Sequence, residues 1–139
     1  MKGQLRFSVR RAPSPEQVHR LFQTAPWARD RTVAQIRVML KHSDLVATIW
    51  HGAELVGMAR VSTDFAFRAV LWDVIVERRW LGQGLGTKLV KGLLAHPRLK
   101  AVDQFWLYTT SKQGFYERLG FKAYPRNTMR LLRGRKAKA

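Results

Sequence analysis

The chain has 139 residues, of which 46% are hydrophobic and 25% charged, a composition that fits one globular domain and excludes a disordered chain. Its 26 Lys and Arg outnumber 9 Asp and Glu, and the formal net charge of +17 favours anionic partners: nucleic acid, an anionic cofactor or an acidic protein. Cysteine is absent, which excludes disulfides and thiolate nucleophiles, and the N-terminus shows no signal peptide, so we expect a soluble, cytoplasmic protein without a membrane span.

The first part of the chain predicts a strand followed by two helices. Apolar and polar residues alternate over residues 5–9, as in a half-buried strand. Ser14, Pro15 and Gln17 then form a capping-box sequence, so a helix should begin there. A second helix is expected to start near Asp30 or Thr32, because the apolar residues that follow recur at helical spacing. Three cations are assigned to its exposed face: Arg31, Arg37 and Lys41.

The rest of the chain alternates strands and helices. Residues 45–50 and 55–61 flank a short glycine turn and predict an antiparallel hairpin, and residues 69–76 predict the next strand. The expected elements that follow are a helix over 84–95, a strand over 102–108, a short helix over 112–119 ended by Gly120, and strands over 121–124 and 128–132. This order predicts an α/β fold: one domain with a mixed, mostly antiparallel sheet and helices on both faces.

The segment V-I-V-E-R-R-W-L-G-Q-G-L-G-T, residues 74–87, joins a strand to a helix through a glycine-rich turn. Glycines let a ligand approach the backbone, and the unpaired N–H groups at a helix start bind phosphate. Two nucleotide motifs fail on spacing. A Rossmann fingerprint that began at Gly82 would need glycine at the position of Thr87, and no Gly-Lys-Ser or Gly-Lys-Thr triplet of a P-loop is present. The turn therefore predicts a phosphorylated cofactor of another kind.

This turn resembles the acetyl-CoA-binding segment of the GCN5-related N-acetyltransferase (GNAT) family, in which Arg or Gln, Gly, x, Gly, x, and Gly or Ala follow a strand. The matching residues are Val76, Gly82, Gln83, Gly84, Leu85 and Gly86, with Leu81 in place of Arg or Gln. A second family block is matched by Tyr116, Gly120 and Phe121, with Thr109 and Lys112 in place of its Asn and Ala. The resemblance covers about residues 46–132.

The resemblance implies an N-acetyltransferase domain over residues 1–132 and a basic tail over 133–139. Such a domain moves acetyl directly from acetyl-CoA to a primary amine of a small molecule, peptide or protein. The implied cofactor-binding residues are Val74, Ile75 and Val76 for the pantetheine, and Gly82, Gln83, Gly84, Leu85, Gly86 and Thr87 for the pyrophosphate. Arg78 and Arg79 can add positive charge beside them. The sheet is expected to splay between residue 76 and the strand over 102–108, which opens a cleft for the pantetheine.

Two side chains are candidates for the chemistry. Tyr116 is assigned as the general acid that serves the departing thiolate, although it also suits a packing aromatic beside Phe115. Asp73 interrupts an apolar strand, and it is either a general base for the amine or a structural carboxylate paired with a nearby arginine. The four histidines lack the spacing of a helical metal site, so no metal is expected.

Two alternatives to an N-acetyltransferase that acts on a small molecule, peptide or protein stay open. The same fold can act on an amine carried by RNA, such as aminoacyl-tRNA, which the net charge of +17 would allow. A module that binds acyl-CoA or nucleic acid without catalysis is the other. The walls of the amine pocket are expected from residues 21–41 and 124–129, and the chain is expected to be a monomer or a homodimer.

Overall fold

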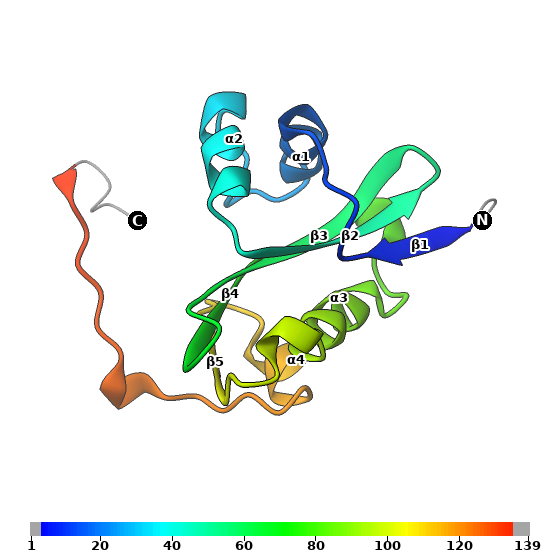
Figure 1. Cartoon of the computed structure of the whole chain (residues 1–139). Coiled ribbons are helices and arrows are strands. Elements are labelled where there is room, and N and C mark those ends of the chain that lie inside the picture. The colour runs from blue at the N-terminus through cyan, green and yellow to red at the C-terminus, as the bar shows by residue number, and fades with distance from the viewer. Residues whose placement is uncertain (1–3, 135–139) are drawn as a thin grey trace. The chain divides into compact units, whose positions relative to one another are not determined.

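The computed structural model (Figure 1) describes residues 4–134. The chain forms two compact units, with the boundary between Tyr108 and Thr109. Of the predicted basic tail, only Arg133 and Gly134 lie within the described residues. The elements are, in chain order, β1 (Leu5–Ser8), α1 (Pro15–Phe22), α2 (Val33–Lys41), β2 (Leu45–His51), β3 (Glu54–Thr63), β4 (Arg68–Val76), η1 (Arg78–Trp80), α3 (Leu85–Leu94), η2 (Pro97–Leu99), β5 (Gln104–Trp106), α4 (Gln113–Glu117) and η3 (Pro125–Asn127), where η marks a short 3₁₀ helix.

The first unit is built on a five-stranded sheet in which the strands follow one another in the order β1-β2-β3-β4-β5. Neighbours are antiparallel from β1 to β4, and β5 joins β4 in parallel after the α3 crossover. The predicted β2–β3 hairpin is confirmed: His51 pairs with Glu54 across a two-residue turn. Gly52 in that turn has φ of +62°, a conformation that glycine adopts at little cost.

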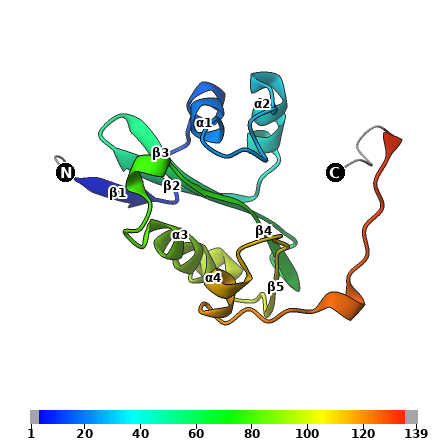
Figure 2. The same ribbon diagram turned by 180° about the vertical axis from the view of Figure 1, so that it is seen from behind.

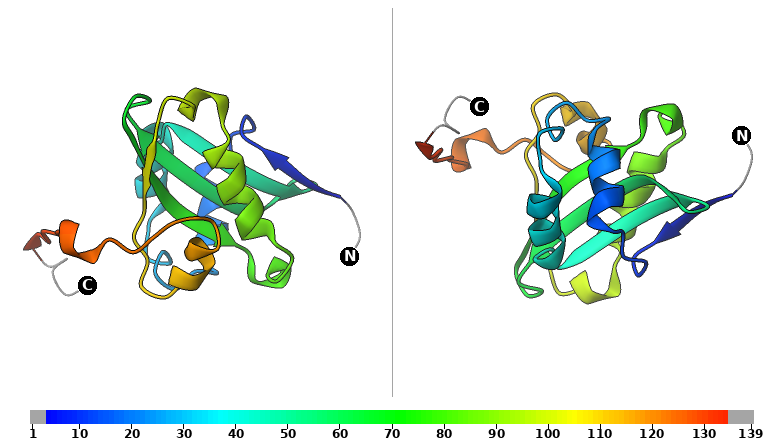
Figure 3. Two further views of the ribbon diagram at one scale, coloured as in Figure 1. Left: turned by 90° about the horizontal axis from the view of Figure 1, so that it is seen from below. Right: turned by 90° about the horizontal axis from the view of Figure 1, so that it is seen from above.

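Helices cover both faces of this sheet. Figures 1 and 2 show α1 and α2 on one face and α3 on the other, and the two views in Figure 3 look onto these faces in turn. Phe22 of α1 and Ile36 of α2 are buried in a core cluster with Trp50 and Met58 of the sheet. On the opposite face, a Cβ on Gly57 would lie 3.5 Å from a methyl group of Leu89 in α3. The predicted mixed sheet with helices on both faces is thus confirmed.

The starts of α1 and α2 follow from local sequence. Ser14 Oγ accepts a hydrogen bond from the Gln17 N–H at 3.1 Å, and the Gln17 side chain accepts from the Ser14 N–H at 2.8 Å. Thr32 and Gln35 form the same capping box at the start of α2. The prediction that Arg31 lies on the exposed face of α2 is wrong: it precedes the N-cap, and its side chain turns inward to Asp73.

The second unit contains α4 and irregular chain. Gly120, with φ of +99°, ends the helical region as predicted. Its N–H donates to the Glu117 carbonyl at 3.0 Å and the Phe121 N–H donates to the Tyr116 carbonyl at 3.1 Å, which is a Schellman motif. The strands predicted over 121–124 and 128–132 are wrong, because residues 118–134 hold no strand and Pro125 starts η3 between them. Without ladder partners, a short isolated hairpin is marginal in water.

No helix within residues 4–134 has the length and apolar character needed to cross a membrane.

Candidate active site

The second half of β4 offers an unpaired edge within residues 4–134. β5 pairs with β4 only at Arg68, Ala69 and Val70, and the ladder ends there. The other edge of β4 stays bonded to β3 as far as Val76. The predicted separation of the two strands is therefore present, and residues 74–76 retain backbone groups that can bond an extended ligand in the manner of an added strand.

A β-bulge interrupts β4 at Asp73. Trp72 pairs with Arg60 and Ile75 pairs with Met58, so β4 has one residue more than β3 between these pairs. Asp73 has φ of +53°, the left-handed conformation that is uncommon for a residue with a side chain. Consecutive side chains of a regular strand point to opposite faces, yet Trp72 and Asp73 both contact Arg60. The bulge thus turns the Asp73 carboxylate towards Arg60.

The Asp73 carboxylate lies in a cluster with two arginines. Its Oδ2 atom accepts a hydrogen bond from Arg60 Nε at 2.7 Å and from Arg31 Nη1 at 2.9 Å. The Asp73 side chain is 4% exposed, and such a buried carboxylate needs compensating partners. Arg60 also donates from Nη1 to Ser43 Oγ at 3.3 Å. This arrangement matches the structural alternative for Asp73, and its role as a general base stays a prediction.

The glycine-rich turn lies between η1 and α3 and is open to solvent. Gly82 and Gly84 have φ of +82° and +77°, and a Cβ at either would meet nothing within 4 Å on the protein. Gly84 is the N-cap of α3 and provides no side-chain cap, so the first-turn N–H groups depend on another partner. Free N–H groups, the helix dipole and a backbone without Cβ atoms suit a phosphate group at this position.

The cations beside this turn are not equivalent. Arg79 forms ion pairs with Glu54 and Glu77, which offset much of its charge. Arg78 forms no ion pair in the described part of the chain, so it is the residue with charge to offer a phosphate. Leu81 is 60% exposed and contributes no polar group where the family has Arg or Gln.

Trp80 in η1 anchors the turn to the sheet. The residue is 3% exposed and its ring lies 5.0 Å from the ring of His51 in β2. Its Nε1 atom is buried without a hydrogen-bond partner among residues 4–134. The buried Trp80 ring therefore fixes the backbone two residues before Gly82, a role that the sequence motif alone does not reveal.

Tyr116 lies in the second unit, on α4. Its ring contacts Phe115 at 4.9 Å and Phe121 at 5.8 Å between centroids, both near perpendicular. Partial burial raises the pKa of the Tyr116 phenol, which keeps its proton in place at neutral pH. Thr109, which replaces the family asparagine, accepts a hydrogen bond from the Lys112 N–H at 3.1 Å and so supports the start of α4.

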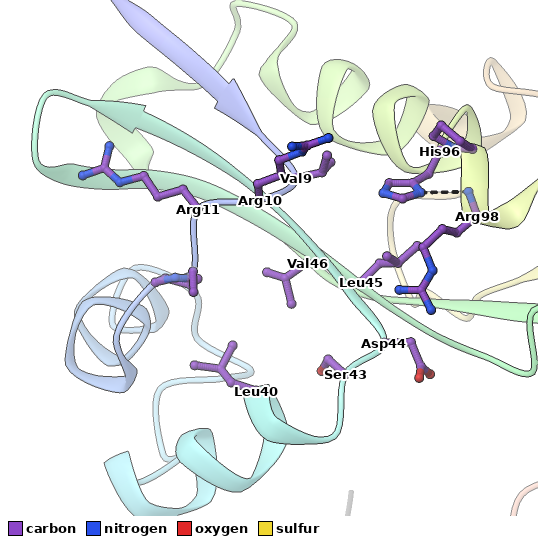
Figure 4. Close-up of a pocket in the computed structure, with 13 residues that line it drawn as sticks. Val9, Arg10, Arg11, Leu40, Ser43, Asp44, Leu45, Val46, His96 and Arg98 are labelled. Carbon is purple, nitrogen blue, oxygen red and sulfur yellow. Dashed lines mark hydrogen bonds between the residues drawn. The ribbon is translucent and has the colours of Figure 1, made fainter.

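A separate cavity of about 770 Å³ lies in the first unit. It is lined by the chain after β1, by the region where α2 leads into β2, and by η2. Figure 4 shows Leu40 and Val46 beside it, and His96 accepting a hydrogen bond from the Arg98 N–H at 3.1 Å. None of the predicted cofactor residues lines it. The residues that the structure describes contain no group of three His, Asp or Glu side chains placed to hold a metal.

Neither Arg31 nor Arg60 was predicted as a partner of Asp73, although Arg31 lies within residues 21–41, which were expected to wall the amine pocket. Arg60 interrupts the apolar strand β3 as Asp73 interrupts β4, and that parallel was the available signal. Arg31 offered no such signal, because it lies in an irregular segment 42 residues away in sequence from Asp73.

The chain belongs to the acetyltransferase (GNAT) family, whose family model matches residues 9–121. It is 36% identical over 111 residues to the histone acetyltransferase TAP1 of Glycine max, covering 71% of this chain and 48% of that protein. It is 33% identical over 121 residues to the chloroplastic GCN5-related N-acetyltransferase 2 of Arabidopsis thaliana, covering 71% and 46%. A crystal structure of a GNAT-family protein from Xanthomonas campestris pv. campestris superposes with a TM-score of 0.81 at 28% identity, covering 93% of both chains.

The chain thus spans about half the length of these curated relatives. The resemblance in fold and the family membership concern the acetyltransferase domain. The N-acetylglutamate synthase of Neisseria gonorrhoeae, which shares the fold with a TM-score of 0.73 at 13% identity, was solved in complex with coenzyme A.

Proposed function

We propose that this chain is an N-acetyltransferase that moves acetyl from acetyl-CoA directly to a primary amine. The observation that carries the proposal is the continuity of two features: the unpaired edge of β4 at residues 74–76, and the open glycine turn at the start of α3. The first suits the amides of pantetheine and the second suits the pyrophosphate.

In the proposed reaction, the amine nitrogen attacks the thioester carbonyl carbon. The C–N bond forms, the C–S bond breaks and the amine loses a proton. The departing thiolate takes a proton or a hydrogen bond from Tyr116, whose raised pKa keeps the phenol protonated. The chain has no cysteine, so acetyl is not passed through a cysteine thioester.

The role of Asp73 is best described as positioning. Two arginines donate to its Oδ2 atom, so the carboxylate holds both guanidinium groups in place. Because this carboxylate is 4% exposed and already engaged by both arginines, we favour solvent as the group that deprotonates the amine, with Asp73 as the alternative base.

An acceptor amine carried by RNA is the second candidate, favoured by the charge of the second unit. Residues 109–134 carry one acid, Glu117, and six exposed cations: Lys112, Arg118, Lys122, Arg126, Arg130 and Arg133. If RNA presents the amine, binding should weaken steeply with salt, because each phosphate contact releases a counterion.

The test measures acetyl transfer from acetyl-CoA to a panel of amines, peptides and aminoacyl-tRNA. The free thiol of the released coenzyme A is detected as the signal. Tyr116→Phe should lower kcat by roughly ten- to a hundred-fold and leave the Kd for acetyl-CoA within about two-fold of wild type. Equal losses in kcat and affinity would show that the hydroxyl is structural. Binding of acetyl-CoA without transfer to any acceptor would favour the non-catalytic module.

A cytoplasmic location of the protein stays a prediction.

A further inference from the structure

We propose that the acceptor amine also carries a carboxylate or a similar anionic group, and that Arg31 recognises this group. The inference rests on the proposed function and names the class of acceptor for it. Its basis is the cluster of Arg31, Arg60 and Asp73, together with its place at the bulge of β4.

The direction of the cofactor places the cluster beside the reacting group. With the pyrophosphate at Gly82 and Gly84, a pantetheine bonded along residues 74–76 runs back along β4, against the chain direction. Its thiol end therefore approaches Asp73, the residue before this stretch. The Asp73 carboxylate contacts Arg31, which lies in the connection between α1 and α2, so an amine that reaches the thioester from that side meets the cluster.

The cluster carries a net positive charge. Two guanidinium groups share one carboxylate, and in the described residues neither Arg31 nor Arg60 has another acidic partner. The excess of one charge lies next to a side chain that is 4% exposed, where charges interact more strongly than in water. An anionic group on the acceptor would balance this excess, whereas an acceptor with only an ammonium group would add to it. The same field favours the neutral, nucleophilic form of the amine.

Arg31 is the member of the cluster that a ligand can reach. Its side chain is 34% exposed, compared with 16% for Arg60, whose guanidinium also bonds Ser43. Arg31 Nη1 bonds Asp73, so Asp73 fixes the orientation of the guanidinium and leaves its other donors available. The guanidinium also lies 5.6 Å from the ring of Trp27, which is 60% exposed and provides an apolar surface beside the charge.

The experiment compares acceptors that differ only in charge: tyrosine against tyrosine amide, and tryptophan against tryptophan amide. The amide has the less basic amine and hence more of the nucleophilic form, so this bias works against the proposal. We expect kcat/KM to be at least about ten-fold higher for the free carboxylate, mostly through KM. Arg31→Gln should reduce that ratio to near one, and Arg31→Lys should retain part of it.

Arg20→Gln is the matched control, because it removes the same charge from an exposed position on α1, outside the expected pocket walls, and should keep the wild-type ratio. Calorimetric titration of the same four acceptors into the coenzyme A complex gives a readout independent of turnover, with the same order of affinities expected. A ratio near one in wild type, an unchanged ratio in folded Arg31→Gln, or no binding of either amino acid would each overturn the proposal. Transfer only to amines that lack an anionic group would overturn the proposal about Arg31, while leaving the proposed acetyltransferase activity intact.

Discussion

Tyr116 carries its proton well above neutral pH, since partial burial beside Phe115 and Phe121 raises the pKa of its phenol. A general acid is active while protonated, so activity is lost as pH rises through its pKa. Because that pKa is raised from an ordinary value of about 10, we expect kcat/KM to rise with deprotonation of the amine and to show no fall below about pH 10. A pH–rate profile of wild type and Tyr116→Phe checks this. A descending limb between pH 7 and 9 that disappears in the variant would contradict it.

Leu81 is the position where this chain departs from its family in the cofactor turn. The side chain is 60% exposed, so replacing it removes little packing. In Leu81→Arg the guanidinium should reach the phosphates beside Gly82 and lower the Kd for acetyl-CoA by roughly two- to five-fold at low salt. Leu81→Gln adds a polar group without charge, so it is the control that shows how much of the gain in acetyl-CoA affinity is due to charge. Titration at two salt concentrations measures both, and a gain that persists unchanged at 1 M salt would show that charge is not its cause.

At the scale of elements, the start of α3 depends on a left-handed residue at Gly84, with φ of +77°. Gly84→Ala should cost about 1–2 kcal/mol of unfolding free energy, because an L-residue is strained there. It also adds a methyl group where a phosphate should approach, so the Kd for acetyl-CoA should rise at least about ten-fold.

Gly52→Ala is a matched control for this change, because Gly52 has φ of +62° and open space around its Cβ position, but lies in the β2–β3 turn. Urea unfolding of both variants should show similar losses of stability, and calorimetry should show weaker cofactor binding for Gly84→Ala alone. Equal affinities of the two variants would remove the α3 turn from the cofactor site.

Elements that depend on short-range patterns were predictable from the sequence, and those that depend on distant partners were not. The helix start at Ser14 and Gln17 involves residues three apart, and the Gly52 turn joins adjacent strands, so both could be predicted. The strands expected over 121–124 and 128–132 required partners that no local pattern specifies, and they did not form.

The same limit applies to the candidate site. The glycine turn and Tyr116 lie in contiguous motifs, which made them recognisable in the sequence. The ion pair of Arg31 with Asp73 links residues 42 positions apart, and the orientation of Asp73 depends on the bulge in β4. A bulge is defined by the register between two strands, so it cannot be predicted from the alternation within one of them.

The whole molecule carries a formal net charge of +17, and most of its cations lie outside the cofactor turn. Such a charge attracts the anionic acetyl-CoA from a distance, and this long-range share is screened as the Debye length falls from about 10 Å at 0.1 M salt to about 3 Å at 1 M. With a small amine that has no anionic group as acceptor, we expect the KM for acetyl-CoA to rise several-fold between 0.1 M and 1 M salt. The value of kcat should change by less than about two-fold. Initial rates at fixed pH measure both constants.

An acceptor on RNA predicts a different response to salt. The KM for the RNA would then rise far more steeply than the KM for acetyl-CoA, because several phosphate contacts release counterions together. Neutralising Arg126 and Arg130 of the second unit should make that slope shallower, whereas neutralising Arg20 and Arg37 on the two helices of the first unit removes equal charge at another surface. Equal slopes in the two double variants would assign the salt effect to the overall charge and argue against an RNA contact on the second unit.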